Sequence, residues 1–225
     1  MEKPEFFDFI RSLKKKKCHA PLDDDDDDDD DCKLEALENL DLSRCELAKK
    51  LSHDGRSLGE LLTAIHLHLP MLKRLCLSEN RLVSLPPEIG KFQQQLVAFH
   101  ASGNELTALP TELGLLTKLD TLGLEKNQLV HLPTELGLLS ELDCLYLSHN
   151  RLECVPAELG RLSKLTELDL AHNRITKLPR EWKGLVELER LKLWHNRINS
   201  LPREVERLPV LKELRWDGMV PRNIR

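Results

Sequence analysis

Leucines recur along this chain with a period of 23 residues. In the unit that starts at Leu119, leucines stand at 119, 122, 124, 129, 132, 136 and 139, with Asn127 and Pro133 between them. Leu142 starts the same pattern again, and further copies start at Leu72, Leu96, Leu165 and Leu188. An internal repeat this regular predicts an array of short units that bury their leucines only by stacking on one another.

Each unit divides into a strand, a turn and a return segment. Leu122 and Leu124 alternate with outward positions, which predicts a short strand. Asn127 follows the strand, and its amide can satisfy buried backbone groups of its own repeat and of the next one. Pro133 ends extended pairing because proline has no N–H. Gly137 is expected to provide a left-handed conformation in a turn or short 3₁₀ segment.

The first and last repeats depart from this pattern. The first contains extra residues in which leucine and isoleucine have helical spacing, with Ser57 and Glu60 forming a capping box at the start and Pro70 ending the helix. An eighth copy begins at Leu211 but loses the pattern at Met219. Because an open leucine end is a liability for a repeat protein, we expect self-association at the C-terminal end.

The N-terminal residues have a different composition. Apolar residues within 5–13 have helical spacing and precede Lys14–Lys17, which suits a short amphipathic helix on an anionic membrane or in a partner groove; loose docking on the first repeat is the alternative. The nine aspartates 23–31 repel one another and predict a solvated linker. We therefore expect a flexible leader over 1–33 and a repeat domain over 34–225.

The repeat unit resembles that of the leucine-rich repeat family. The motif LxxLxLxxNxLxxLPxxLGxLxx stands nearly unaltered from Leu72 to Leu208. This resemblance implies an α/β solenoid, a right-handed horseshoe of about eight repeats with a parallel concave sheet. The LP-x-E-[IL]-G form is similar to the intracellular repeats of the Ras-group and Scribble–Erbin type. It implies a cytoplasmic scaffold or adaptor in signalling that binds a protein partner, such as a small GTPase.

Composition and charge exclude several other classes of protein. The net charge of −5 comes from the aspartate run, so residues 32–225 are nearly neutral and nucleic acid is not an expected partner. No apolar run is long enough for stable membrane insertion. The six cysteines have no paired spacing, which predicts free thiols in a reducing compartment and agrees with a cytoplasmic location.

The outward strand positions are the candidate partner site. In the last four repeats they carry side-chain types that are common anchors of protein interfaces. We expect a partner-binding patch on the concave face that consists of Tyr146, Asp169, Lys192, Trp194 and Arg215. An ordinary mixed surface is the alternative.

Two further ladders flank the asparagines. Arg151, Arg174 and Arg197 stack like charges, which an acidic partner or Glu153 could neutralise. Residues 151–225 hold 16 lysines and arginines against 11 acidic residues, which favours an acidic partner; a solvated basic edge is the alternative. His149, His172 and His195 form the second ladder, but no Cys or carboxylate column completes a tetrahedral site, so no metal is expected.

No catalytic pattern is present in the sequence. It contains no phosphate-binding glycine loop, no HExxH motif and no serine in a nucleophile elbow, so we expect neither an enzyme nor a cofactor. The alternative function is a recognition subunit of a larger regulatory complex, such as a ubiquitin ligase substrate receptor or an immune-type sensor.

Overall fold

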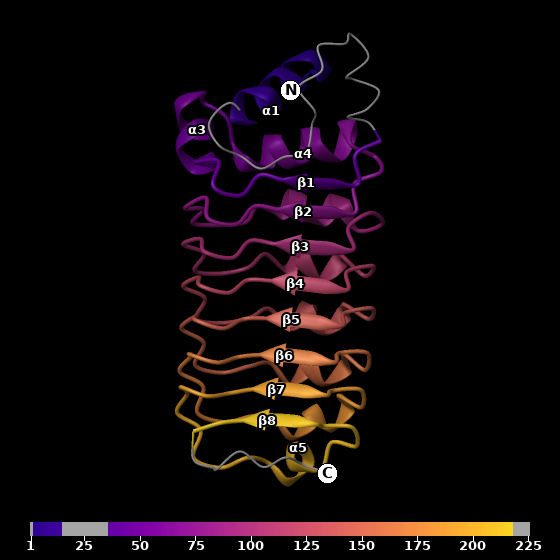
Figure 1. Cartoon of the computed structure of the whole chain (residues 1–225), viewed down its shortest axis with the longest axis vertical. Helices are drawn as coiled ribbons and strands as arrows, with labels where there is room; N and C mark the ends of the chain where they lie inside the picture. Colours follow the sequence, from indigo (N-terminus) through magenta and orange to yellow (C-terminus); the bar gives the residue numbers. More distant parts are fainter. Residues whose placement is uncertain (1, 15–35, 218–225) are drawn as a thin grey trace.

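The computed structural model of the chain describes residues 2–14 and 36–217. Within these ranges, eight strands of three residues each form one parallel sheet in which strand order follows chain order. Each repeat adds one strand beside the strand of the repeat before it, so the molecule is an elongated stack (Figure 1). The strands are β1 (Asn39–Asp41), β2 (Arg74–Cys76), β3 (Ala98–His100), β4 (Thr121–Gly123), β5 (Cys144–Tyr146), β6 (Glu167–Asp169), β7 (Arg190–Lys192) and β8 (Glu213–Arg215).

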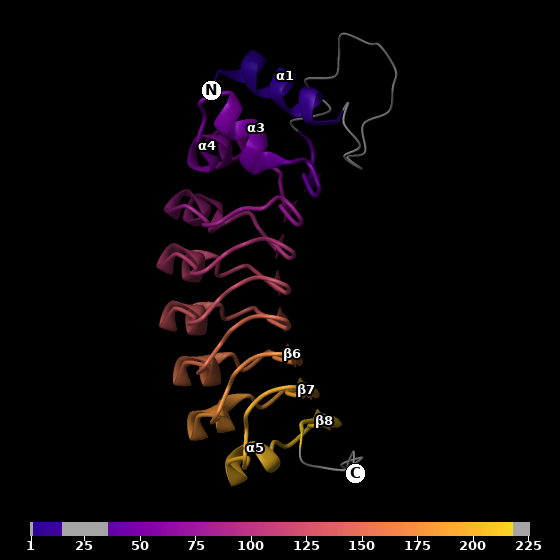
Figure 2. The same ribbon diagram turned by 90° about the vertical axis from the view of Figure 1, so that its left-hand side faces the viewer.

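Short helices cover the side opposite the sheet. Figure 2 shows the strands along the inner side of a gentle curve and the helices along its outer side. The 3₁₀ helices are η1 (Pro87–Phe92), η2 (Thr111–Leu115), η3 (Thr134–Leu138), η4 (Ala157–Arg161) and η5 (Arg180–Gly184). The α-helices are α1 (Lys3–Lys14), α3 (Leu47–His53), α4 (Leu58–His68) and α5 (Arg203–Glu206). The predicted α/β solenoid of about eight repeats is therefore confirmed.

The core lies between these two sides and is almost entirely aliphatic. Leu122 of β4, Leu124 directly after this strand and Leu136 of η3 are each fully buried, and the same holds for their counterparts in most repeats. Burial of one leucine side chain contributes about 1.5–3 kcal/mol, so stability comes from many equivalent small contributions. Trp182 replaces leucine in η5 and is also fully buried, where its indole N–H donates to the Pro156 carbonyl at 3.3 Å.

The asparagine ladder is confirmed, but it points toward the preceding repeat and not the next one. The Asn150 amide donates to the Leu147 carbonyl of its own repeat and to the Leu124 carbonyl of the repeat before, each at 3.0 Å. Its Oδ1 accepts the N–H of Leu129 at 3.0 Å. One side chain thus satisfies backbone groups of two repeats at the bend that follows the strand.

The glycines of the return segment have a different role from the one expected. A left-handed conformation is predicted at Gly90, Gly114, Gly137 and Gly160, and none of them has a positive φ. They are small because the next repeat is close: a Cβ on Gly137 would lie 2.4 Å from the Glu158 carbonyl oxygen. Proline precedes each 3₁₀ helix in extended conformation, with φ of −66° at Pro133.

Left-handed backbone occurs instead at the residue before each asparagine. The residues concerned in the regular repeats are Glu79, Gly103, Lys126, His149, His172 and His195. The φ angles of the three histidines are 56°, 54° and 56°. Histidine is one of the non-glycine residues enriched in this region, which accounts for its use at this bend.

The N-terminal end is closed by α-helices. The predicted helix after Ser57 is α4, and its capping box is present: the Glu60 N–H donates to Ser57 Oγ, and the Ser57 N–H donates to Glu60 Oε2. Helix α3, which forms in the longer first repeat, is not among the helices expected from the sequence. Figure 1 shows α1, α3 and α4 together at the end of the stack beside β1.

Helix α1 belongs to the core of the repeats. Its five apolar side chains, Phe6, Phe7, Phe9, Ile10 and Leu13, are buried in the same hydrophobic cluster as the leucines. The predicted helix is confirmed, but its apolar face is covered and is not offered to a membrane or a partner groove. Residues 15–35, which include the aspartate run, lie outside the described part, so a domain boundary at residue 33 stays a prediction.

Among the cysteines that the structure describes, one differs from expectation. Cys76, Cys144 and Cys154 are free thiols, but Cys45 is disulfide-bonded. The prediction that every cysteine is free is therefore wrong at Cys45, and cysteine usage does not identify the compartment. In the described part of the chain, no helix has the length and apolar character needed to cross a membrane.

Candidate protein-binding surface

Three columns of outward side chains run along the concave sheet, one before, one between and one after the two strand leucines. The strand register aligns Tyr146 with Asp169, Asp169 with Lys192, and Lys192 with Arg215. The structure thus places four of the five predicted site residues on neighbouring strands in one column. Trp194 belongs to the next column. The Arg215 guanidinium reaches across to it and lies 5.9 Å from the centroid of the Trp194 ring.

A buried carboxylate that is not among the predicted site residues organises this patch. Glu167 is only 8% exposed, and it accepts hydrogen bonds from Lys192 Nζ at 2.6 Å and from Arg190 Nε at 3.0 Å. Burial acts to raise the pKa of Glu167, but these two cations outweigh it and the net pKa is lowered. The strand alternation contained the signal, because Glu167 and Asp169 are two residues apart and therefore share a face.

Asp169 is held in the same network. It accepts the Ala171 N–H at 3.0 Å, and Lys192 Nζ lies 3.9 Å from its carboxylate. Burial raises the pKa of Asp169, and the Ala171 hydrogen bond and the charge of Lys192 oppose that shift in part. Lys192 is therefore shared between two carboxylates, which hold its ammonium in a defined position.

Tyr146 and Trp194 are half-buried rather than free in solvent. The Tyr146 phenol is neutral near pH 7 and offers both a donor and an acceptor, and burial raises its pKa further above the ordinary value. The Trp194 indole N–H donates to His172 Nε2 at 3.3 Å. Half-buried aromatic side chains with a polar group are common at protein interfaces.

The arginine ladder lies at the bend beyond the strands. Arg151, Arg174 and Arg197 are exposed, and none of them forms an ion pair with another residue of the described ranges. Glu153, one of the two expected counter-charges, does not pair with them. The same bend near the N-terminus differs, because Arg44 forms a two-point ion pair with Glu79 there, at 2.6 and 2.9 Å.

The histidine ladder is stacked face to face. The ring centroids of His149 and His172 are 4.0 Å apart with planes 12° from parallel, and those of His172 and His195 are 4.3 Å apart. Stacked rings direct their nitrogens outward and not toward one shared point. The described ranges, 2–14 and 36–217, contain no cluster of three His, Cys, Asp or Glu side chains placed to hold a metal ion.

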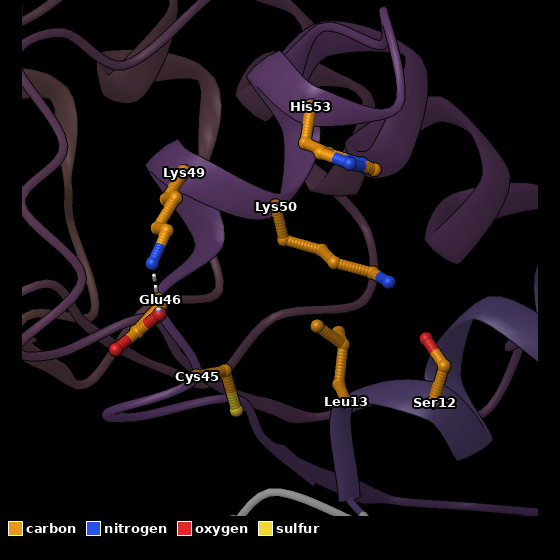
Figure 3. A pocket seen from close by; sticks show the side chains of 7 residues that line it. All are labelled: Ser12, Leu13, Cys45, Glu46, Lys49, Lys50 and His53. Atoms are coloured by element: carbon orange, nitrogen blue, oxygen red, sulfur yellow. Dashed lines mark ion pairs between the residues drawn. The ribbon is translucent and has the colours of Figure 1, made fainter.

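A pocket of about 200 Å³ lies at the N-terminal end, between α1 and α3. Figure 3 shows Lys49 paired with Glu46 on one side and Lys50 and His53 facing Ser12 and Leu13 on the other. Its cations already have partners: Lys49 lies 3.6 Å from Glu46, and Lys50 lies 3.7 Å from Asp54. The pocket therefore offers a ligand little uncompensated charge.

Comparison with protein-family models identifies the repeats. A leucine-rich repeat model matches residues 117–175, 140–198 and 163–217, and a second leucine-rich repeat model matches residues 71–92. Together these matches cover more than half of the chain. The chain belongs to the leucine-rich repeat family, so the resemblance seen in the sequence is confirmed.

Individual relatives share the repeats but are much longer proteins. A leucine-rich repeat and calponin homology domain-containing protein of Drosophila melanogaster is 47% identical over 53 residues, which are 24% of this chain and 7% of the fly protein. A solved leucine-rich repeat protein of Leptospira interrogans superposes with a TM-score of 0.65 at 32% identity, over 82% of this chain and 47% of that one.

A plant receptor domain shows the same fold. The leucine-rich repeat ectodomain of the Arabidopsis thaliana membrane receptor kinase GASSHO1/SCHENGEN3, solved in complex with CASPARIAN STRIP INTEGRITY FACTOR 2, superposes with a TM-score of 0.60 at 35% identity. That match covers 65% of this chain and 18% of the receptor chain. Leucine-rich repeat domains bind proteins in general, and this chain shares that general role.

Proposed function

We propose that this chain is a non-enzymatic, cytoplasmic scaffold or adaptor in signalling, and that it binds a partner protein on the C-terminal half of its concave face. The binding patch consists of Tyr146, Asp169, Lys192, Trp194 and Arg215. The observation that carries this proposal is that Glu167 holds Lys192 in place. Lys192 lies among aromatic and charged side chains that are not part of the leucine core.

Fixed polar groups favour binding because a partner does not have to order them. Glu167 and Asp169 restrain Lys192 from two sides, and the Glu167 carboxylate also restrains Arg190. Immobilising a long side chain on binding costs about 0.5–1.5 kcal/mol, so a restrained lysine binds with a smaller entropy loss. The stacked repeats add a rigid sheet beneath the patch.

The N-terminal half of the same face supports the choice of the C-terminal half. Ser78 and Ser102 are small, and His100 folds over Gly123, where a Cβ would lie 2.4 Å from His100 Nδ1. The Ser102 hydroxyl also donates to the Glu125 carboxylate at 2.5 Å, so both groups already have a partner within the chain. Large anchors are concentrated in repeats five to eight.

The finer parts of the proposal follow from the resemblance and the charge pattern. The intracellular form of the repeats makes a small GTPase or another signalling protein the first class of partner to examine. The unpaired ladder of Arg151, Arg174 and Arg197 favours a partner with an acidic surface. We also propose that the C-terminal end takes part in self-association.

The concave patch is tested by replacing its aromatic anchors. We expect the double variant Tyr146→Ala/Trp194→Ala to lose a partner that the wild-type chain captures stoichiometrically from a lysate of the source organism. Loss of one anchor at an interface typically costs about 2 kcal/mol or more, so the double variant should bind at least ~100-fold more weakly. The captured protein is then purified and titrated by calorimetry.

A matched control removes apolar surface elsewhere. Leu115 and Leu138 are 45% and 49% exposed on the outer side, so Leu115→Ala/Leu138→Ala removes exposed apolar area away from the sheet. Retained binding in this control and lost binding in the concave variant support the proposal. Equal affinity of the wild-type chain and the concave variant, with both folded by circular dichroism, would falsify the concave-face assignment.

A further inference from the structure

The bend that follows strands β5, β6 and β7 carries positive or titratable side chains and no carboxylate at the two positions flanking its asparagines. We call this surface the basic edge, and it consists of Arg151, Arg174, Arg197, His149, His172 and His195. The six residues form two columns, because each bend has one histidine before the asparagine and one arginine after it.

The arginine column has a spacing that the backbone fixes. The N–H of Arg151 donates to the Leu129 carbonyl, that of Arg174 to the Leu152 carbonyl, and that of Arg197 to the Ile175 carbonyl, at 2.8–2.9 Å. Because the same bond recurs in each repeat, the three arginines project from equivalent points one repeat apart. Their guanidinium groups are exposed and have no counter-charge within the described part of the chain.

At the other end of the molecule, the position before the asparagine is occupied by an ion pair. Arg44 there is held by Glu79 of the next repeat through two hydrogen bonds. Repeats five to seven have histidine at this position and so place no carboxylate beside the arginine column. A row of like charges is stabilised when a ligand of opposite charge lies along it.

The histidine column adds a charge that depends on pH. The rings stack at centroid distances of 4.0 and 4.3 Å, so protonation of one disfavours protonation of the next. The groups that face His172 are His149, His195, Asp169, Asp217 and the Trp194 N–H. Burial and then the two neighbouring histidines lower the pKa of His172, against the opposing effect of the two aspartates.

We propose that the basic edge binds an acidic segment of a protein partner, and that this binding tightens as the pH falls through the histidine range. The inference rests on the proposed function, since it names the chemistry of the partner and the way in which its binding is regulated. At neutral pH the arginines carry the contact. Below that range the histidines also become charged, because carboxylates lying along the edge compensate the repulsion within the stack.

The probe for this experiment is a fluorescein-labelled peptide of ten glutamates, titrated with the full chain and followed by anisotropy. Glutamate with a pKa near 4.3 remains ionised at pH 6.0, so a change between pH 7.5 and pH 6.0 reports the protein and not the probe. The titration is repeated on a chain whose aspartates 23–31 are replaced by asparagine, so that a second acidic segment in the same chain cannot compete.

Two triple variants test the arginine column and the histidine column one at a time. We expect Arg151→Gln/Arg174→Gln/Arg197→Gln to weaken peptide binding about tenfold, since each exposed ion pair contributes a modest amount. The control Arg180→Gln/Lys183→Gln/Arg203→Gln removes the same charge from the outer side and should leave affinity within about twofold of wild type. The variant His149→Asn/His172→Asn/His195→Asn replaces each histidine by asparagine, which tolerates the left-handed backbone of the bend and does not titrate.

The wild-type chain should bind the peptide about threefold or more tightly at pH 6.0 than at pH 7.5, and the asparagine variant should show no such change. Absence of binding in both aspartate backgrounds, or equal weakening by the outer-side control, overturns the site. An unchanged pH dependence in the asparagine variant overturns the role of the histidines.

Two further probes decide the class of ligand. Tighter binding of a 20-base-pair RNA duplex or of vesicles containing phosphatidylserine than of the peptide overturns the assignment to an acidic protein segment. The failure of this inference is distinguishable from failure of the proposed function: the arginine variant in the glutamate titration reports the edge, whereas partner capture by a Tyr146→Ala single variant, which leaves the Trp194–His172 hydrogen bond in place, reports the concave patch.

Discussion

Single asparagine side chains provide hydrogen bonds to the buried backbone groups at the bend that follows each strand. Each asparagine after a strand holds carbonyls of two repeats and accepts an N–H from the preceding one, as Asn150 does. The hydrogen bonds are buried, so water cannot replace them when the side chain is removed. This position is therefore more sensitive to substitution than its small contact area suggests.

The first prediction concerns this ladder. Asn150→Ala leaves the Leu129 N–H and the Leu124 and Leu147 carbonyls without their partner, and we expect a loss of about 2–4 kcal/mol in the free energy of unfolding. Chemical denaturation followed by circular dichroism measures it. Asn199→Ala, at an exposed position of a later repeat, serves as the control and should change stability by less than about 0.5 kcal/mol.

The second prediction concerns Glu167 and pH. Its pKa in the folded chain is lowered from the ordinary 4.5, so its contribution to stability is present above that value and is lost as the pH falls through the lowered folded pKa. Glu167→Gln removes the charged acceptor of Lys192 and Arg190, at a loss of about 1–3 kcal/mol near pH 7.

The difference in melting temperature between the wild-type chain and Glu167→Gln should therefore shrink on acidification from pH 7 to pH 3. Thermal melts at intervals of half a pH unit measure this convergence. Asp143→Asn, which replaces an exposed carboxylate, is a matched control. Two melting curves that stay parallel throughout this pH range would show that Glu167 is not stabilised by its two cations in solution.

At the scale of the elements, close approach between consecutive 3₁₀ helices explains the glycines. Gly114, Gly137 and Gly160 each lack room for a Cβ because the carbonyl of the next repeat lies 2.3–2.4 Å from where it would be. Backbone cannot move aside as the end of a flexible side chain can. The conformational explanation expected from the sequence is replaced by a packing one.

The third prediction follows from this packing. Gly137→Ala should destabilise the chain by about 1–3 kcal/mol, because the added methyl group forces η3 and η4 apart. Leu138→Ala at the adjacent, half-exposed position should cost less than about 1 kcal/mol. The comparison uses urea denaturation at one temperature, and an equal cost for both variants would show that η3 and η4 separate without strain.

The fourth prediction concerns helix α1 as a cap. Phe7 is 1% exposed, and with Phe6 it packs near His68 at the end of α4, so Phe7→Ala should cost about 3–5 kcal/mol. Glu2→Ala, at an exposed position just before the helix, is the control. If loss of the Phe7 ring leaves the unfolding midpoint unchanged, α1 does not protect the first repeat.

The whole molecule behaves as a one-dimensional stack, in which each repeat contacts only its neighbours. The N-terminal end is closed by α1, α3 and α4, whereas at the last described strand Leu214 and Trp216 are only partly buried. Val210 nearby is 42% exposed. Stability in such stacks is a sum of repeat and interface contributions, so association that buries these apolar side chains would add to it.

The fifth prediction tests self-association at this end. Sedimentation velocity of the full chain should show a concentration-dependent dimer, and Val210→Glu should shift it to monomer because a charge would be buried in the contact. Val83→Glu, at an exposed position near the other end, should leave the dimer intact. A wild-type chain that sediments as a monomer at all concentrations contradicts the prediction.

The repeat period, the strand positions and the asparagine ladder followed from the sequence because they depend on local periodicity. Leu122 and Leu124 are two residues apart in an extended segment, so both side chains face the same core. In each repeat, the asparagine that follows lies beside the same backbone groups that need a hydrogen-bond partner. The concave columns were predictable for the same reason, since neighbouring repeats in register bring equivalent residues together. Family membership followed from the same motif.

Contacts between repeats required the folded structure. Glu167 becomes the centre of the patch only when Arg190 and Lys192 of the next repeat fold over it, and burial of that carboxylate has no local signature in the chain. The buried face of α1 likewise depends on a partner about 60 residues away, His68 at the end of α4. Periodicity specifies which way each side chain points, whereas its partner and its pKa depend on distances that only three-dimensional packing sets.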